Sequence, residues 1–270
     1  MEKKASIRKR ARDLFFRAAH SLFVCRCIAC GEVIASDAVF CDTCEEEYRA
    51  ARLSECGICA RSLSRCLCAD TAFSGSIIHK HIKLYRYLSH DPDAVGNRIL
   101  YRLKSNDVNI CFRFLGSELA KCASELLPLD ESYVITHLPR TRERVNECGF
   151  DQSERIAKEL GYALDLPTLS LLTRTRRGKM QKALSSVTAR ERNAAASLSL
   201  AKNAERRLEG RRVLLVDDVV TSGASMRAAA KLLRTAGARE IIAVSVATVT
   251  HTRNLKTEAE KNSHLPPYMR

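Results

Sequence analysis

Residues 213–225 read Val-Leu-Leu-Val-Asp-Asp-Val-Val-Thr-Ser-Gly-Ala-Ser. Four apolar residues precede two adjacent acids, Asp217 and Asp218, which is typical of a buried strand that ends at its carboxylates. A short loop of hydroxyl-bearing residues and one glycine follows from Thr221 to Ser225, and a helical pattern begins at once. This order of strand, loop and helix start predicts an α/β fold.

The loop also predicts a binding site for an anion. Unpaired backbone N–H groups and the positive end of a helix would point at one spot there. Ionised Asp217 and Asp218 can only accept hydrogen bonds, which suits the hydroxyls of a sugar attached to a bound phosphate. The predicted ligand is therefore a ribose 5-phosphate. A Walker A loop is excluded because the Gly-Lys-Ser/Thr ending is missing, whereas an ordinary buried strand with an acidic turn is the competing interpretation.

Short apolar runs alternate with helical patterns through the rest of this region. Alternating strands and helices favour right-handed crossovers and a parallel sheet, whose ligands bind at the carboxyl ends of the strands. Gly161 and Gly237 are expected to end two of the helices. We expect strands near residues 77–82 and at 133–139, 169–173, 212–217 and 241–249, with helices at 95–103, 110–127, 151–160 and 224–236.

Nine of the twelve cysteines lie between residues 25 and 68, and eight of these form four close pairs. Three pairs have C-x-x-C spacing and one has C-x-C spacing. Two such pairs can offer four thiolates to one tetrahedral ion, so the spacing predicts two zinc ions. The simplest grouping is sequential, although an interleaved one stays open. It places Cys27, Cys30, Cys41 and Cys44 around one ion and Cys56, Cys59, Cys66 and Cys68 around the other.

A disulfide framework or an iron–sulfur cluster could use the same cysteines. Disulfides need an oxidising compartment, and no export signal is visible. Paired knuckles at this spacing fit zinc better than iron and sulfide. Four thiolates close the shell of each ion, which indicates a structural role. Cys25 is left over, and Cys111, Cys122 and Cys148 are expected to be buried thiols.

The two ends of the chain differ from its middle. Basic residues and a short apolar run occupy residues 1–24, but Arg17 and His20 interrupt any signal-peptide core. We expect an amphipathic leader helix there, a loose polar tail at 251–270 and a cytoplasmic protein. No apolar stretch is long enough to span a bilayer.

The chain of 270 residues carries a net charge of +14. A solvated basic surface, attraction of a polyanionic small substrate and contact with nucleic acid all fit this excess. The absence of Trp argues against a stacking platform for single-stranded nucleic acid.

Residues 174–192 form a basic segment, because they contain seven Lys and Arg residues and one acid. A basic lid there could close over a substrate and neutralise a leaving pyrophosphate, through Arg174, Lys179 or Lys182.

Residues 213–225 resemble the phosphoribosyl-pyrophosphate (PRPP) signature of type I phosphoribosyltransferases. Taken with the cysteine pairs and the basic segment, the chain resembles the ComF family, an amidophosphoribosyltransferase-like family, from about Cys27 to Val249. His137-Leu138-Pro139 and Leu172-x-Arg174 also match that family. One motif departs from it, since Cys148-Gly149-Phe150-Asp151-Gln152 stands where Arg-Gly-Phe-Asn-Gln is usual.

The resemblance implies a type I phosphoribosyltransferase-like parallel sheet at 71–250, with a double zinc ribbon at 25–70. It also implies roles for individual residues, and Mg²⁺ bound together with PRPP. The two acids would hold the ribose diol, and the strand end at Pro139 and Arg140 would seat pyrophosphate. A variable hood, residues 73–110, would supply the acceptor pocket. The implied 5-phosphate contacts are Val219, Val220, Thr221, Ser222, Gly223, Ala224 and Ser225.

Two kinds of function fit these features. The chain could transfer a phosphoribosyl group from PRPP to a nitrogen acceptor, although no residue stands out as a general base. It could instead be a non-catalytic PRPP or nucleotide sensor, or an accessory protein that handles DNA. The family resemblance suggests single-stranded DNA or competence proteins as partners for the second kind.

Overall fold

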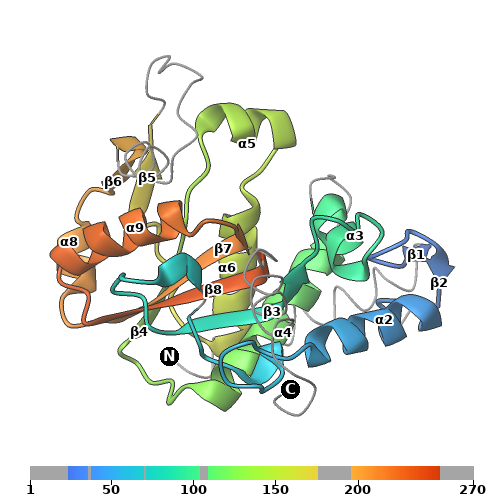
Figure 1. The fold of residues 1–270 in the computed structure, drawn as a ribbon. Helices are drawn as coiled ribbons and strands as arrows, with labels where there is room; N and C mark the ends of the chain where they lie inside the picture. Colours follow the sequence, from blue (N-terminus) through green and yellow to red (C-terminus); the bar gives the residue numbers. More distant parts are fainter. Residues whose placement is uncertain (1–23, 36–37, 70, 104–108, 176–195, 250–270) are drawn as a thin grey trace, which may run out of the picture.

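The structure, a computed structural model, describes residues 24–35, 38–69, 71–103, 109–175 and 196–249 (Figure 1). The expected leader helix, the tail and most of the basic segment lie outside these ranges. A four-stranded parallel sheet forms the centre, in the order β3 (His81–Tyr87), β8 (Glu240–Val249), β7 (Arg212–Val220) and β4 (Tyr133–His137). The predicted parallel α/β fold is confirmed.

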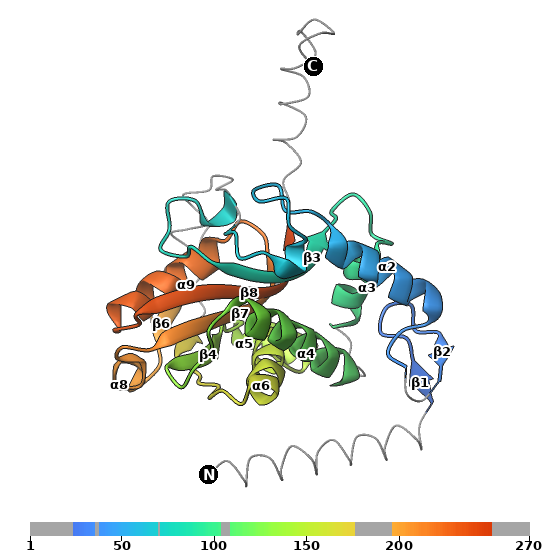
Figure 2. The same ribbon diagram turned by 90° about the horizontal axis from the view of Figure 1, so that it is seen from below.

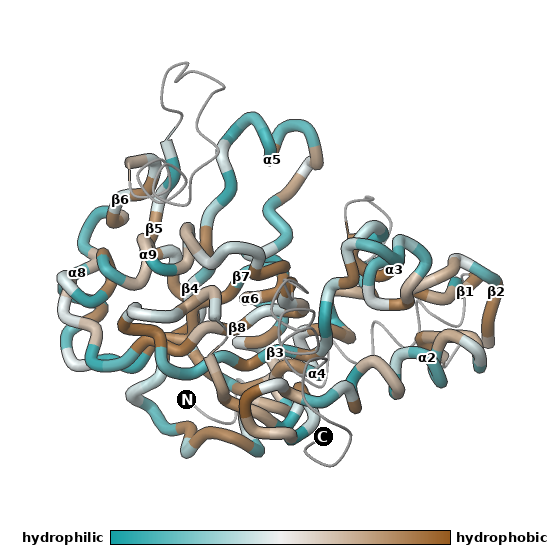
Figure 3. Tube along the Cα trace, viewed as in Figure 1, coloured by the Kyte–Doolittle hydropathy of each residue, from teal (hydrophilic) through white to brown (hydrophobic). Residues whose placement is uncertain are grey.

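Both faces of this sheet are covered by helices. Alternate side chains of β7 enter two separate cores, with Leu214 and Val216 on one face and Val213 and Leu215 on the other. Helices α4 (Asn109–Leu126) and α6 (Gln152–Leu164) pack on the first face, and α9 (Ala224–Thr235) packs on the second (Figure 2). The two central strands, β7 and β8, are correspondingly hydrophobic along most of their length (Figure 3). A strand buried on both faces needs such a continuous apolar run.

The cysteine-rich segment packs beside β3 and α4. It contains β1 (Cys25–Arg26), β2 (Val33–Ile34), α2 (Asp42–Leu53) and the short 3₁₀ turns η1 (Leu63–Arg65) and η2 (Thr71–Phe73). Helix α3 (Val95–Arg102) lies next to α2. Phe40 stacks on Tyr48 at 5.1 Å between ring centroids and meets Phe114 of α4 edge-on at 5.2 Å. The first part of this segment therefore shares a core with the sheet domain.

Two expected boundaries were wrong. Helix α6 runs past Gly161 to Leu164 and ends at Asp165, which is left-handed at φ +56°. A side chain at Gly161 would collide with Thr168, so this glycine allows close packing and does not end the helix. Strand β7 continues past its two carboxylates to Val220, because β8 runs alongside and pairs with it that far.

The remaining differences concern short or displaced elements. Strand β3 begins at His81, later than expected, and β5 (Leu172–Arg174) begins after residue 169. Strand β5 pairs with β6 (Leu198–Leu200), away from the main sheet. The sequence did not predict β6, α2, α5 (Arg142–Cys148) or α8 (Ala204–Leu208). Across the described ranges, no helix is both long and apolar enough to cross a membrane.

Candidate functional site

The loop between β7 and α9 leaves the first turn of α9 free to bind an anion. Gly223 is the N-cap residue, has a left-handed φ of +70° and provides no side chain to cap the helix. The helix proper begins when the Arg227 N–H donates to the Gly223 carbonyl at 2.8 Å. The N–H groups of Ala224 and Ser225 precede that bond and have no carbonyl one turn back, so they face outward from the positive end of the helix.

The two carboxylates stand immediately before this loop and have different partners. Asp217 Oδ1 accepts hydrogen bonds from Ser153 Oγ and from the Asp218 N–H, both at 2.9 Å. Asp218 Oδ1 accepts from the Val219 N–H at 2.9 Å, and its Oδ2 accepts from Arg140 Nη2 at 2.5 Å. Asp218 therefore has a counter-ion of its own, whereas Asp217 has only neutral donors.

This difference shows in the protonation of the pair. Burial raises the pKa of Asp217 well above its ordinary value, and the adjacent charge of Asp218 raises the pKa further. The hydrogen bond from Ser153 opposes that shift without cancelling it. Asp217 therefore holds a proton at pH values where an exposed Asp has lost it.

Two arginines bring positive charge to the same place. Arg174 on β5 donates to Ser225 Oγ at 3.0 Å and to the Pro139 carbonyl at 3.3 Å, so one guanidinium joins the candidate phosphate loop, residues 221–225, to the segment after β4. Burial lowers the pKa of Arg174, and the nearby Asp217 and Asp151 counteract this. With Arg140 on Asp218, two cations lie beside two acids.

The sequence did not reveal the role of the start of α6. Asp151 caps this helix through the Glu154 N–H at 3.2 Å and also accepts from the Arg140 N–H at 2.7 Å. Ser153, in the first turn of the helix, donates to Asp217. The Asp-x-x-Glu spacing of residues 151–154 signals a helix start, but only the folded chain shows that this helix start meets β7.

Two further polar side chains at this edge are buried. Burial lowers the pKa of His137, at the end of β4, while the charge of Asp151 raises it. The Nδ1 atom of His137 and both side-chain amide atoms of Gln152 have no hydrogen-bond partner within the described ranges.

The structure thus brings together residues that are distant in the sequence. Asp217, Asp218, Arg140, Arg174 and Ser225 converge with Pro139 at the carboxyl edge of the sheet. Val219 and Val220 are the last residues of β7, and Thr221, Ser222 and Gly223 lead into Ala224. Lys179 and Lys182 lie outside the described residues.

The eight predicted zinc ligands form two groups in the sequential order, Cys27, Cys30, Cys41 and Cys44, then Cys56, Cys59, Cys66 and Cys68. Within each group all four sulfur atoms lie within 4.8 Å of one another. A tetrahedral zinc ion with bonds of about 2.3 Å places its sulfurs about 3.8 Å apart, and Cys30 Sγ lies 3.7 Å from Cys41 Sγ. All twelve cysteines are free thiols. Both groups could bind a metal ion such as zinc.

The first thiol of each group has a lowered pKa. Burial alone would raise the pKa of Cys27, but backbone N–H groups, including those of Cys30, Cys41 and Ala29, lower it to about 7. The N–H groups of Ile58 and Cys59 likewise lower the pKa of Cys56 to about 7 despite its burial. Thiolates are the metal-binding form, so this backbone geometry favours metal uptake.

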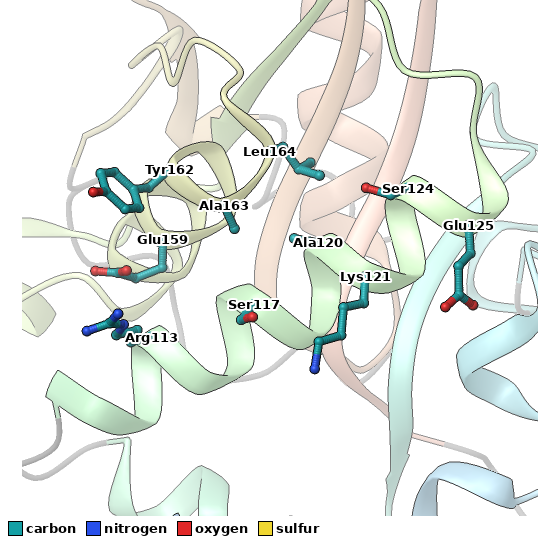
Figure 4. A pocket seen from close by; sticks show the side chains of 10 residues that line it. All are labelled: Arg113, Ser117, Ala120, Lys121, Ser124, Glu125, Glu159, Tyr162, Ala163 and Leu164. Carbon is teal, nitrogen blue, oxygen red and sulfur yellow. The ribbon is translucent and has the colours of Figure 1, made fainter. Parts of the chain in front are cut away.

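A hollow of about 500 Å³ lies between α4 and α6 (Figure 4). Its lining includes Arg113, Lys121, Glu159 and Tyr162. The contribution of α6 comes from Glu159 to Leu164, the half that lies away from Asp151 and Ser153. This hollow is therefore separate from the cluster at the carboxyl edge of the sheet.

Comparison with known proteins agrees with this geometry. Residues 150–265 match the family model of the phosphoribosyl transferase domain, and this range includes α6, Arg174, both acids and the loop. This part of the chain is similar to a phosphoribosyl transferase domain. Over 95 residues, 34% of its length, it is also 36% identical to Competence protein F of Haemophilus influenzae, and the match covers 40% of that protein.

Several solved structures are distantly similar to parts of this chain. The allosteric regulatory enzyme of purine biosynthesis is 25% identical, with a TM-score of 0.34, over 50% of this chain and 25% of that chain. Adenine phosphoribosyl transferase from Trypanosoma brucei is 13% identical, with a TM-score of 0.35, over 75% of this chain and 70% of that chain. The similarity to the phosphoribosyl transferase domain over residues 150–265 and the parallel sheet stand apart from these distant similarities.

The raised pKa of Asp217 predicts how the stability of this domain changes with pH. A carboxyl whose pKa is raised on folding stabilises the protein below its unfolded pKa of about 3.9, and this contribution is lost as pH rises through the folded pKa. The loss is about 1.4 kcal/mol for each unit by which folding raises the pKa. Asp217→Asn cannot ionise, so it should become progressively more stable than the wild type as pH rises.

Urea unfolding of both proteins between pH 5 and pH 9 measures this difference. Asp165→Asn is the matched control, because Asp165 is exposed and Asn tolerates its left-handed conformation. A difference between wild type and Asp217→Asn that stays constant with pH would contradict the raised pKa.

Proposed function

We propose that the carboxyl edge of the sheet binds PRPP and transfers its phosphoribosyl group to a nitrogen acceptor. The observation that carries this proposal is the meeting of Asp217 and Asp218 with the uncapped first turn of α9. A phosphate fits the helix start, and a vicinal diol one sugar ring away fits two adjacent carboxylates. The phosphoribosyl transferase domain supports the same ligand.

Each group around the loop has a task in this proposal. Residues Thr221 to Ser225 hold the 5-phosphate, and the two acids hold the 2- and 3-hydroxyls. Arg174 and Arg140 would neutralise the pyrophosphate, and Lys179 and Lys182 of the basic segment would add to this charge. The bond between ribose C1 and the pyrophosphate oxygen breaks, a bond from C1 to the acceptor nitrogen forms, and that nitrogen loses a proton. Mg²⁺, bound to the pyrophosphate as part of the substrate, would supply further neutralisation.

The electrostatic arrangement explains why the reaction would be accelerated. Charge develops on the departing oxygens as the bond to C1 breaks, and fixed guanidinium groups stabilise that charge without reorganising. Arg174 is already held by Ser225 and Pro139, so its position does not depend on the substrate.

Incubating the protein with PRPP, Mg²⁺ and a panel of nucleobases and amines tests the proposal. We expect pyrophosphate to be released with at least one acceptor and not without any. PRPP binding that yields no pyrophosphate with any acceptor would favour the sensor function over transfer. No PRPP binding at all would overturn the proposal.

A second candidate is a role in handling DNA during competence. The match to Competence protein F and the net charge of +14 support it. Binding of single-stranded DNA should then weaken steeply as salt rises, because each phosphate contact releases a counter-ion. No binding at low salt would remove this candidate. We further propose that the protein works in the cytoplasm, where the eight thiols stay reduced and able to hold two zinc ions.

A further inference from the structure

The short turn η2 touches the phosphate loop directly. The carbonyl of Ala72 accepts a hydrogen bond from Arg227 Nη1, and the same nitrogen donates to the Ser222 carbonyl at 2.8 Å. A Cβ atom added to Gly223 would lie only 2.5 Å from the Ala72 carbonyl oxygen. The loop that would hold the 5-phosphate is therefore packed against Ala72 and joined to it by Arg227.

The same turn follows closely on the second cysteine group. Cys68, the last member of that group, precedes Ala72 by four residues in the sequence. The stretch before η2 is hydrogen-bonded to the start of β3. The His81 N–H donates to the Leu67 carbonyl at 3.0 Å, and Cys68 pairs with Lys80 in an isolated antiparallel β-bridge. Phe73 at the end of η2 packs edge-on against the His81 ring at 5.2 Å. Both ends of this connection are thus held in place.

Lys83 on β3 adds an electrostatic link. Its side chain is fully buried, and its Nζ donates to the Cys68 carbonyl at 2.8 Å and lies 3.9 Å from Cys66 Sγ. A buried ammonium needs a nearby negative charge. Four thiolates around one divalent ion carry a net charge of about −2, so the metal-filled second group provides an anionic partner for Lys83.

The first cysteine group has different neighbours. Cys44 Sγ lies 3.5 Å from Arg98 Nη2 on α3, and Phe40 and Tyr48 beside it pack on Phe114 of α4. None of these contacts involves the phosphate loop. The two groups have similar chemistry but different positions relative to the site.

We propose that metal in the second cysteine group positions the phosphate loop through Ala72 and Arg227, so that affinity for PRPP depends on metal in this group and not in the first. The dependence on PRPP rests on the proposed function. The coupling between the second cysteine group and the loop does not, because it depends on the contacts of Ala72 with Arg227 and Gly223.

Two matched substitutions separate the groups. Cys30 and Cys59 are the exposed members of the first and second groups, so Cys30→Ser and Cys59→Ser remove one thiol each without opening the core. Elemental analysis should show that each variant has lost one of two metal equivalents. Titration calorimetry with Mg-PRPP should then show affinity lowered at least about 10-fold in Cys59→Ser and changed less than about 2-fold in Cys30→Ser. Equal affinities in the two variants would overturn the proposal.

A third variant tests the connection with both metals in place. Arg227→Gln removes the guanidinium that joins Ala72 to Ser222 and should lower PRPP affinity while the metal content stays at two equivalents. Arg234→Gln is its control, since Arg234 lies at the other end of α9 and donates to the Ala238 carbonyl at 3.1 Å. If Arg227→Gln binds PRPP as tightly as the control, the connection does not run through Arg227.

Hydrogen exchange without ligand distinguishes this proposal from the proposed function. Amides of residues 219–226 should exchange faster in Cys59→Ser than in wild type, and at the wild-type rate in Cys30→Ser. That result would support the mechanical link even if no variant bound PRPP. Unchanged exchange in Cys59→Ser after confirmed metal loss would overturn it.

Discussion

Replacing both acids, as Asp217→Asn and Asp218→Asn together, is expected to lower the affinity for PRPP by at least about 100-fold. A hydrogen bond to a charged group contributes about 1.5–3 kcal/mol, and the double substitution weakens two of them. An amide can still accept a hydrogen bond, but it carries no charge. It also presents a donor where the ribose hydroxyl needs an acceptor.

The fold should tolerate this change well. Burial raises the pKa of Asp217 and so disfavours the charge that this substitution removes, and Asn has nearly the same size as Asp. Asp218→Asn loses the charge opposite Arg140 in a mostly buried pair, whose side chains are 23% and 19% exposed, so we expect a cost of about 1–3 kcal/mol. Titration calorimetry at pH 8, with Asp165→Asn as control, measures the affinity. Double-variant heats equal to those of the control would place the ribose elsewhere.

Gly223→Ala is expected to cause the second large effect, because it acts on the backbone of the phosphate loop. An alanine at φ +70° costs about 1–2 kcal/mol, and its Cβ would clash with the Ala72 carbonyl oxygen at 2.5 Å. Overpacking of this kind costs about 1–3 kcal/mol more. We expect the free energy of unfolding to fall by about 2–5 kcal/mol, and PRPP affinity to fall at least about 10-fold because the loop must shift.

Gly210→Ala is a control for the backbone strain alone. Gly210 has the same φ of +70°, but no atom outside its immediate neighbours lies within 4 Å of the position its Cβ would take. This variant should lose about 1–2 kcal/mol and bind PRPP normally. Equal losses of stability in both variants, measured by urea unfolding, would mean that the contact with Ala72 is unimportant. Normal PRPP binding by a destabilised Gly223→Ala would separate the loop from the ligand.

The central strands and helices could be predicted because their patterns are local. Each of these elements is indicated by a pattern within a short window of sequence. The patterns are the apolar runs of β7 and β8 and the helical periods of α3, α4 and α9. The end of helix α6 shows where local patterns fail. Gly161 normally signals a helix end, but here its missing side chain makes room for Thr168 from another segment. Contacts between distant segments override the local signal there.

The candidate site was predictable in part for the same reason. Asp217, Asp218 and the loop are contiguous, so one window contains them and their spacing already suggests a ribose phosphate. The partners of these residues come from other elements. Ser153 on α6, Arg140 after β4 and Arg174 on β5 are brought to the two acids and the loop only when parallel strands align their carboxyl ends.

By itself, the amino-acid sequence determined the parallel α/β class, the position of the candidate phosphate loop and eight thiols in four close pairs. These features depend on residue type and short spacing, which the chain carries whether or not it is folded. The tertiary structure alone decided that Asp217 is a half-buried acid with a raised pKa, and that the turn after the second cysteine group packs against Gly223. Burial and contact between distant segments arise only when the chain folds and water is removed from between them.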